Sequence, residues 1–135
     1  MALLFWHKDY EVGISKVDSQ HKHLIDLINR LHAAMLQGNN KEEVSAVIDN
    51  LQKYSQYHFN TEEELFDKHN YSASEKHKSS HAYFICRIQQ FKEDFDSLRG
   101  GLTMEMLQFL RDWWISHIMM EDKEFGPFLV EKGCS

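Results

Sequence analysis

The sequence predicts an all-α protein, an up-down-up-down four-helix bundle with an N-terminal arm and a short C-terminal segment. Proline occurs only once in the 135 residues, so little in the chain interrupts a helix. Four stretches carry apolar side chains at steps of three or four residues, which is the period of one helix face. Short turns separate these stretches, so successive helices are expected to run antiparallel. The length fits a single domain, residues 1–135, with one core.

The first predicted helix follows an arm. Residues 1–17 mix aromatic and charged side chains without a clear period, and we expect them to form an ordered arm. Asp18 or Ser19 can cap the helix that follows, and "QGNN" (37–40) ends it. Its predicted inward side chains are His21, Leu24, Ile28, Leu31 and Met35.

The second predicted helix starts after Asn40, which can act as its cap, and ends near "HNYS" (69–72). Glu62 is the one residue of the acidic run 62–64 that is expected to turn inward, while Glu63 and Glu64 belong to a solvated face. The predicted inward side chains are Val44, Val47, Leu51, His58, Glu62 and Leu65.

The third and fourth helices complete the bundle, which spans about residues 18–118 and leaves 119–135 as the C-terminal segment. Ser72 and Glu75 have capping-box spacing at the start of the third helix, and "RGG" (99–101) ends it. Thr103 can cap the fourth. The inward stripes are His77, His81, Phe84, Ile88, Phe91, Phe95 and Leu98 on the third helix, and Met106, Leu110, Trp113 and His117 on the fourth.

Composition argues against several kinds of partner. The net charge is −6 and no Lys/Arg cluster stands out, so neither nucleic acid nor an anionic membrane surface is expected. No segment approaches the roughly 20 apolar residues of a membrane span. We therefore expect a soluble, cytoplasmic protein. Cys86 and Cys134 match no metal or redox spacing and are expected to be reduced thiols.

Polar residues occupy core positions on every predicted helix. They are His21, His58, Glu62, His77, His81 and His117. In an antiparallel bundle all six lie at the same end of the core. Burying a polar group without a partner costs on the order of a few kcal/mol, so these side chains must bind a metal or satisfy one another. Hydrogen bonds between histidines and carboxylates are the alternative that needs no metal.

Asp122 is a candidate seventh member of this group. It follows His117 by five residues, and on a regular α-helix the two side chains would diverge by about 140°. They can share a site only if the helix distorts or ends between them. Gly126 and Pro127 are compatible with an early end.

The kinds of ligand suggest which metal would bind. Five imidazoles and two carboxylates are too many for one zinc ion, which usually takes four ligands. Calcium and magnesium prefer oxygen donors. Two metals that share both carboxylates and a solvent oxygen would divide the histidines three to two. The second metal then keeps an open position, which suits a small diatomic ligand such as O2 on a redox-capable pair.

These residues resemble the hemerythrin family, in particular its single-domain bacterial members. The resemblance includes "VDSQHKHL" around His21, H-x-x-x-E at His58 and Glu62, H-x-x-x-H at His77 and His81, and "FLRDWWISHIMMED". It implies a non-haem di-iron site, with two iron ions per chain and a bridging oxo or hydroxo group, that binds O2 reversibly. By the family pattern, His77, His81 and His117 hold one iron, His21 and His58 hold the iron with the open position, and Glu62 and Asp122 bridge.

The resemblance also implies a pocket for O2. Leu24, Phe59, Trp113 and Ile118 match its lining, whereas Trp114 stands where the family usually has leucine. The larger indole is expected to narrow the pocket or to alter ligand access. NO and small anions such as azide are further expected ligands.

Three functions remain open at this stage. The first is O2 transport, storage or delivery, which is binding without catalysis. The second is a di-iron redox enzyme that handles peroxide or NO, and the third is a sensor of O2 or NO that acts on a partner in trans. Ferritin-type di-iron enzymes use Glu-x-x-His pairs, and this sequence contains no Glu that is followed by His at the third position. No obvious acid or base is present to cleave the O–O bond. Both observations favour reversible binding, and the sequence does not identify a protein partner.

The remaining polar candidates receive modest roles. His7 and His23 are expected to be solvated, His32 to lie in the core or at its boundary, and His69 to cap a helix end. Gln20 is a candidate to support a ligand histidine through a hydrogen bond.

Overall fold

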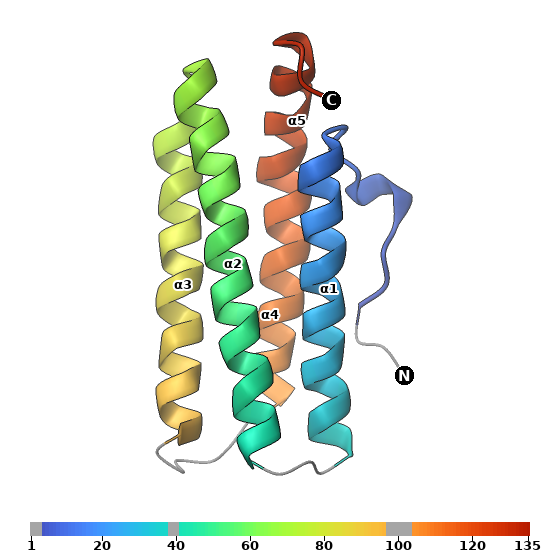
Figure 1. The fold of residues 1–135 in the computed structure, drawn as a ribbon, viewed down its shortest axis with the longest axis vertical. Coiled ribbons are helices and arrows are strands. Elements are labelled where there is room, and N and C mark those ends of the chain that lie inside the picture. The colour runs from blue at the N-terminus through green and yellow to red at the C-terminus, as the bar shows by residue number, and fades with distance from the viewer. Residues whose placement is uncertain (1–3, 38–40, 97–103) are drawn as a thin grey trace.

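The computed structural model describes residues 4–37, 41–96 and 104–135, and within these residues it contains helices and no strands. Four antiparallel helices stand side by side (Figure 1). This confirms the predicted all-α bundle. The helices are α1 (Ser15–Leu36), α2 (Lys41–His69), α3 (Ser74–Asp96) and α4 (Met104–Ser116), and α4 continues through the π-helical segment η2 (His117–Asp122) into α5 (Lys123–Glu131).

The apolar stripes of the helices meet in a main core. Its largest fully buried side chains include Leu24 and Ile28 from α1, Leu51 and Phe59 from α2, Phe84 and Ile88 from α3, and Leu107 and Trp114 from α4. Fully burying a Leu, Ile or Phe side chain stabilises the fold by about 1.5–3 kcal/mol. Five of these eight side chains belong to the predicted stripes, whereas Phe59, Leu107 and Trp114 do not.

A second apolar cluster closes the end of the bundle at which α2 ends and α3 begins. It consists of Val12, Ile14, Val17, Phe66, Tyr71, Phe125 and Leu129. Phe59 of the main core stacks on His81, with ring centroids 4.0 Å apart, and Phe66 of the second cluster lies 4.6 Å from the ring of His77. The polar residues at this end of the bundle thus lie between two apolar clusters.

The arm, described from Leu4 onward, is ordered there and ends at Ile14, earlier than predicted. It includes the 3-10 helix η1 (Lys8–Tyr10) and runs along the outside of α1 (Figure 1). Leu4 is held to α1 because its backbone N–H and C=O both bond to the Asn29 side chain at 2.8 Å. α1 begins at Ser15, and Ile14 in the N-cap position makes no side-chain cap bond.

The predicted cap at Asp18 or Ser19 is therefore wrong, because both residues lie inside α1. The carboxylate of Asp18 instead accepts the backbone N–H groups of Val12, at 2.8 Å, and Gly13, at 3.3 Å. Gly13 has φ = 93°, a conformation that favours glycine. Asp18 thus fixes the turn that leads from the arm into the helix.

Of the other predicted helix ends, the start of the third helix is shifted by two residues, and several lie outside the described residues. α3 begins at Ser74, two residues after the predicted cap Ser72, and its first backbone bond runs from His77 N–H to Ala73 C=O at 3.1 Å. The predicted caps Asn40 and Thr103, the stripe residue Leu98, the "RGG" turn and most of "QGNN" lie outside the described residues.

The fourth helix does not stop near residue 118. Gly126 and Pro127 both lie inside α5, so the expected early end is wrong and the alternative, a distortion, is what occurs. Gly126 has a packing role instead, since a Cβ there would overlap the backbone carbonyl of Val12 in the arm. Among the described residues, no helix is long and apolar enough to cross a membrane.

Candidate metal centre

Seven buried side chains converge between the two apolar clusters, and they are the seven that the sequence singled out. Each residue is at most 2% exposed. The histidines all present Nε2 to the interior of the group. The contributors are His21 from α1, His58 and Glu62 from α2, His77 and His81 from α3, and His117 and Asp122 from η2.

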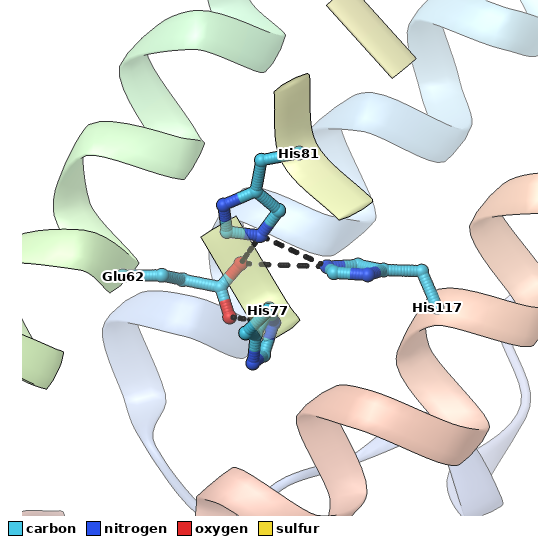
Figure 2. Close-up of side chains that lie close together, drawn as sticks. All are labelled: Glu62, His77, His81 and His117. Atoms are coloured by element: carbon cyan, nitrogen blue, oxygen red, sulfur yellow. Dashed lines mark hydrogen bonds and ion pairs between the residues drawn. The ribbon is translucent and has the colours of Figure 1, made fainter. Parts of the chain in front are cut away.

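One half of the group contains Glu62 and three histidines (Figure 2). Glu62 Oε1 lies 3.4 Å from His81 Nε2 and 3.7 Å from His117 Nε2, and its Oε2 lies 3.8 Å from His77 Nε2. The Nε2 atoms of His81 and His117 are 3.3 Å apart. Three imidazole nitrogens and a carboxylate thus face a common point, as ligands of a single cation would.

The other half contains His21, His58, Glu62 and Asp122. His21 Nε2 lies 2.9 Å from Asp122 Oδ2, and His58 Nε2 lies 2.9 Å from Glu62 Oε1. Asp122 Oδ1 faces the first half, 2.8 Å from His77 Nε2 and 3.3 Å from His117 Nε2. Both carboxylates therefore contact histidines of both halves.

The π-helical segment explains how Asp122 joins His117. A π turn closes with bonds between residues five apart, and the backbone N–H of Lys123 bonds to the carbonyl of Ile118 in this way. Residues five apart then lie one above the other, whereas on an α-helix they would diverge. The segment "HIMMED" thus places both side chains on the inward face, and π-helical turns are frequent at functional sites.

The group fits a bound cation better than a hydrogen-bonded network. Several of its inward-facing atoms are buried without a hydrogen-bond partner in the described structure: Nε2 of His21, His58 and His77, and both carboxylate oxygens of Glu62 and Asp122. Their contacts are as short as 2.8 Å but do not have hydrogen-bond geometry. Buried polar atoms are rarely left unpaired, and a metal ion would satisfy these donor atoms together.

Burial and mutual contacts shift the acidity of these groups. Burial, reinforced by Asp122, raises the pKa of Glu62 well above its usual value. Burial alone would also raise the pKa of Asp122, but the neighbouring imidazoles of His117, His21 and His77 bring it well below its usual value. Burial lowers the pKa of His58 strongly and, with His117, lowers the pKa of His81 to about 2. His58 and His81 are therefore neutral near pH 7, as a metal ligand must be.

Residues around the group hold the outer nitrogens of three histidines. His58 Nδ1 lies 2.7 Å from Gln20 Oε1, so the proposed supporting role of Gln20 matches a real contact. His81 Nδ1 lies 2.9 Å from Glu63 Oε2, and His117 Nδ1 lies 3.1 Å from Glu121 Oε1. Such contacts fix which nitrogen faces the metal.

Sequence reasoning missed two of these partners. Glu63 was expected to be solvated, but its side chain is only 31% exposed and contacts His81 across the α2–α3 interface. Glu121 was not considered, although it follows His117 by four residues, a spacing at which side chains meet. The Ser80 hydroxyl also donates to Glu121, at 2.7 Å. Glu64 is exposed as expected.

Each of these outer carboxylates lies at a surface cleft. One cleft, of about 640 Å³, is lined by Glu63, Phe59 and His81 among others. Another, of about 440 Å³, is lined by Glu121, His77 and Ser80 among others. Glu63 and Glu121 thus each line a surface cleft that a histidine of the group also lines.

Aromatic side chains of the main core lie beside the two-histidine half. Leu24, Phe59, Trp114 and Ile118 are each at most 1% exposed. The Trp114 ring lies 5.9 Å from that of His58 and 6.2 Å from that of His21. Trp113, the expected inward residue, is only partly buried and stacks on His117 at 4.6 Å. Trp114 is thus the more deeply buried of the pair, and its indole N–H has no partner in the described structure.

The four other histidines lie outside the group. His32 is buried, at 8% exposure, as a core residue. His7 and His23 are exposed, and the His23 ring packs on Tyr54 at 4.2 Å. His69, at the end of α2, contacts the Cys134 thiol at 3.5 Å, and Cys86 and Cys134 are both free thiols.

Comparisons with known proteins agree with this geometry. The family model described as "Hemerythrin HHE cation binding domain" matches residues 12–129. The bacteriohemerythrin of Stenotrophomonas maltophilia is 33% identical over 126 residues, which are 93% of this chain and 81% of that protein. The bacteriohemerythrin of Methylococcus capsulatus is 30% identical over 130 residues, 96% of this chain and 98% of that protein.

Solved structures are similar over nearly the whole chain. A crystal structure of wild-type hemerythrin superposes with a TM-score of 0.89 at 29% identity, covering 95% of this chain and 98% of that one. A variant in which a leucine is replaced by phenylalanine superposes with a TM-score of 0.90 at 30% identity, covering 96% and 98%.

Proposed function

The chain belongs to the hemerythrin family, and on that premise we propose that it holds two iron ions in the seven-residue group and binds O2 there reversibly. The role would be transport, storage or delivery of O2, without catalysis. The observation that carries the proposal is that the two buried carboxylates each contact histidines of both halves.

The contacts suggest how the ligands are divided. In this proposal His77, His81 and His117 hold one iron, and His21 and His58 hold the other, which keeps an open position. Glu62 and Asp122 would be shared by the two, since each carboxylate contacts histidines of both halves. Two divalent ions would also offset the charge of two carboxylates in a site with almost no solvent contact. A redox-active iron pair supplies the electrons that O2 takes up on binding and returns on release.

The chain's own residues support binding rather than bond cleavage. Leu24, Phe59, Trp114 and Ile118 are buried apolar side chains, and the rings of Phe59 and Trp114 lie beside that of His58, where they exclude water. Cleavage of O–O would need a proton donor at the ligand. Among the described residues near the site, Glu62 and Asp122 are assigned to the metals, while Glu63 and Glu121 contact the outer nitrogens of histidines. None of these carboxyls is free to act as the acid.

Other ligands and roles stay as alternatives. NO and azide could occupy the same open position. A sensor of O2 or NO acting in trans, or an enzyme for peroxide or NO, would use the same metal site. The cytoplasmic location also remains a prediction.

Optical spectroscopy tests the proposal. Protein reduced under anaerobic conditions should gain a visible absorption band on addition of O2 and lose it when O2 is removed under argon, over several cycles. A Glu62→Ala variant should show no band because it lacks a bridge. A parent protein that is oxidised once and does not return to the reduced spectrum would contradict reversible binding. Turnover of added peroxide or NO would favour the enzyme alternative.

A further inference from the structure

The two halves of the metal centre differ in what holds the outer nitrogens of their histidines. In the three-histidine half, His81 contacts the Glu63 carboxylate and His117 contacts the Glu121 carboxylate. In the two-histidine half, His58 contacts the neutral amide of Gln20. His21 Nδ1 is buried and has no hydrogen-bond partner in the described structure. Among the contacts of the described residues, outer carboxylates therefore hold histidines of the three-histidine half, namely His81 and His117.

This difference changes the ligands themselves. An imidazole whose Nδ1–H is donated to a carboxylate carries more electron density on Nε2 than one that donates to an amide. The negative charge also lies one imidazole away from the metal, in surroundings of lower dielectric than water. Both effects favour a more highly charged metal ion in the half that holds His81 and His117.

We propose that Glu63 and Glu121 are positioning residues that favour the ferric state of the three-histidine half and so lower the reduction potential of the iron pair. Gln20 is a neutral partner of His58, so it favours the ferric state of the iron in the two-histidine half less than a carboxylate would. The inference rests on the proposed di-iron function and adds to it the residues that set its redox balance.

The structure also explains why these side chains are suited to the role. Glu121 is held by the Ser80 hydroxyl at 2.7 Å and lies beside the cleft lined by His77 and Ser80. Glu63 lies beside the cleft lined by Phe59 and His81. Partial contact with water lets each side chain keep its charge at a lower cost than full burial would allow. The contacts also fix Nδ1 outward, so that Nε2 faces the metal.

The test is the midpoint potential of the iron-loaded, O2-free protein, measured by redox titration with mediators and followed by its absorption. Glu63→Gln and Glu121→Gln keep an oxygen that can accept the Nδ1–H but remove the charge. Each of these two substitutions should raise the midpoint potential. For a one-electron step, a shift of about 59 mV corresponds to a tenfold change in the ratio of oxidised to reduced protein at a fixed potential. Gln20→Glu adds a charge to the other half and should lower the potential. Glu64→Gln, at an exposed neighbour, is the matched control and should leave it unchanged.

Opposite shifts in the Glu→Gln and Gln→Glu variants support the inference, because a merely structural defect would not change sign with charge. Potentials equal to that of Glu64→Gln, or shifts in one direction for all variants, would overturn it. If one Glu→Gln variant does not retain iron, the other is compared with Gln20→Glu. If Gln20→Glu does not retain iron, a raised potential in both Glu→Gln variants, against an unchanged Glu64→Gln control, supports the inference and unchanged potentials overturn it. Failure of the parent to bind iron would refute the proposed function instead, whereas unshifted potentials in an O2-binding parent would refute this inference alone.

Discussion

Glu62, like Asp122, contacts histidines of both halves of the metal centre. It is fully buried and lies 2.9 Å from His58 Nε2 and 3.4 Å from His81 Nε2. We expect Glu62→Ala to lose most of the iron and, with it, the stabilisation that a bound ligand gives, about 4 kcal/mol where free metal is 1,000 times its dissociation constant. Iron analysis and thermal unfolding measure the two effects.

The control for this substitution is Glu64→Ala. Glu64 is exposed, so the variant should keep the iron content and melting temperature of the parent. Glu63 would be an unsuitable control because it contacts His81. Equal losses in the Glu62 and Glu64 variants would mean that α2 faces the centre with another side.

Trp114 fills the space beside the two-histidine half. Trp114→Leu should open room next to His21 and His58 while leaving all seven donor side chains in place. We expect unchanged iron content, faster binding of azide to the ferric protein and faster autoxidation of the O2 complex. Stopped-flow mixing and the decay of the O2-complex absorption measure both rates. Rates equal to those of the parent would mean that Trp114 packs without guarding the centre.

A second variant separates bulk from the unpartnered indole N–H of Trp114. Trp114→Phe retains an aromatic ring and lacks the N–H. If bulk protects the O2 complex, this variant should autoxidise at a rate between those of the parent and Trp114→Leu, because phenylalanine is intermediate in size. Autoxidation as fast as in the leucine variant would assign the protection to the N–H instead.

Single residues were predictable from the sequence where helix phase decides burial. The stripe through His77 and His81 continues into Phe84, Ile88 and Phe91, and all five are buried. Phase alone could not identify Glu63, because its partner His81 is on the neighbouring helix and the rotation of two packed helices decides whether they meet. Helix phase also could not decide which of Trp113 and Trp114 is more deeply buried. Neighbouring positions lie about 100° apart, and an apolar stripe of that width can include either one.

At the scale of elements, the π-helical segment is the feature that the centre depends on most. An α turn places a residue at i+4 where a π turn places one at i+5. Deleting Met120, which is 71% exposed, should convert η2 to an α turn and leave the Asp122 carboxylate on the same face as His117. Inserting one alanine after Met120 should rotate the carboxylate away from the centre.

Iron content and circular dichroism compare these two variants. The deletion should retain most of the iron, although the contact between His117 and Glu121 would change because their spacing becomes three residues. The insertion should stay helical and lose iron. Equal iron content in both would show that Asp122 is not needed in the centre.

From the sequence, a distortion of the helix between His117 and Asp122 was only one of two alternatives. The five-residue spacing of His117 and Asp122 required a distortion or an end, and Gly126 with Pro127 appeared to favour an end. The close approach of the arm decided otherwise, since Gly126 is needed where the Val12 carbonyl packs against α5. Likewise, Asp18 was a good N-cap by residue type, but its carboxylate holds the turn at Val12 and Gly13 from inside the helix. Both outcomes depend on contacts between segments that are distant in sequence.

For the whole molecule, the buried histidines make the metal-free protein sensitive to acid. Burial lowers the pKa of His58 and His81, so these side chains stay neutral in the folded state but bind protons below about pH 6.5 in the unfolded chain. The unfolded state then binds more protons, and stability falls as the pH falls, by up to about 1.4 kcal/mol per pH unit for each histidine. The raised pKa of Glu62 makes the folded state more stable as the pH falls, but this is one group, whereas two histidines have the opposite effect.

Chemical unfolding of the metal-free protein at pH 7 and pH 5.5 measures this effect. The urea midpoint should be lower at pH 5.5. A midpoint that stays constant or rises on acidification would mean that proton uptake by His58 and His81 on unfolding does not outweigh the proton released by Glu62, contrary to this prediction.

The overall arrangement followed from the sequence because its causes are local. Apolar period sets the faces of the helices, and short turns make neighbours antiparallel, so residues at the start of one helix and the end of the next meet at one end of the bundle. His21, His58, His77 and His117 meet in this way. What needed the structure was the outer set of contacts, because those depend on how the helices are rotated and on the path after His117.

The iron content of the purified protein tests the central claim most directly. Protein produced with ample iron should contain two iron ions per chain, because seven donor side chains in two overlapping groups, joined by two carboxylates, are arranged for two metals. One zinc ion and no iron per chain, under the same conditions, would contradict the account.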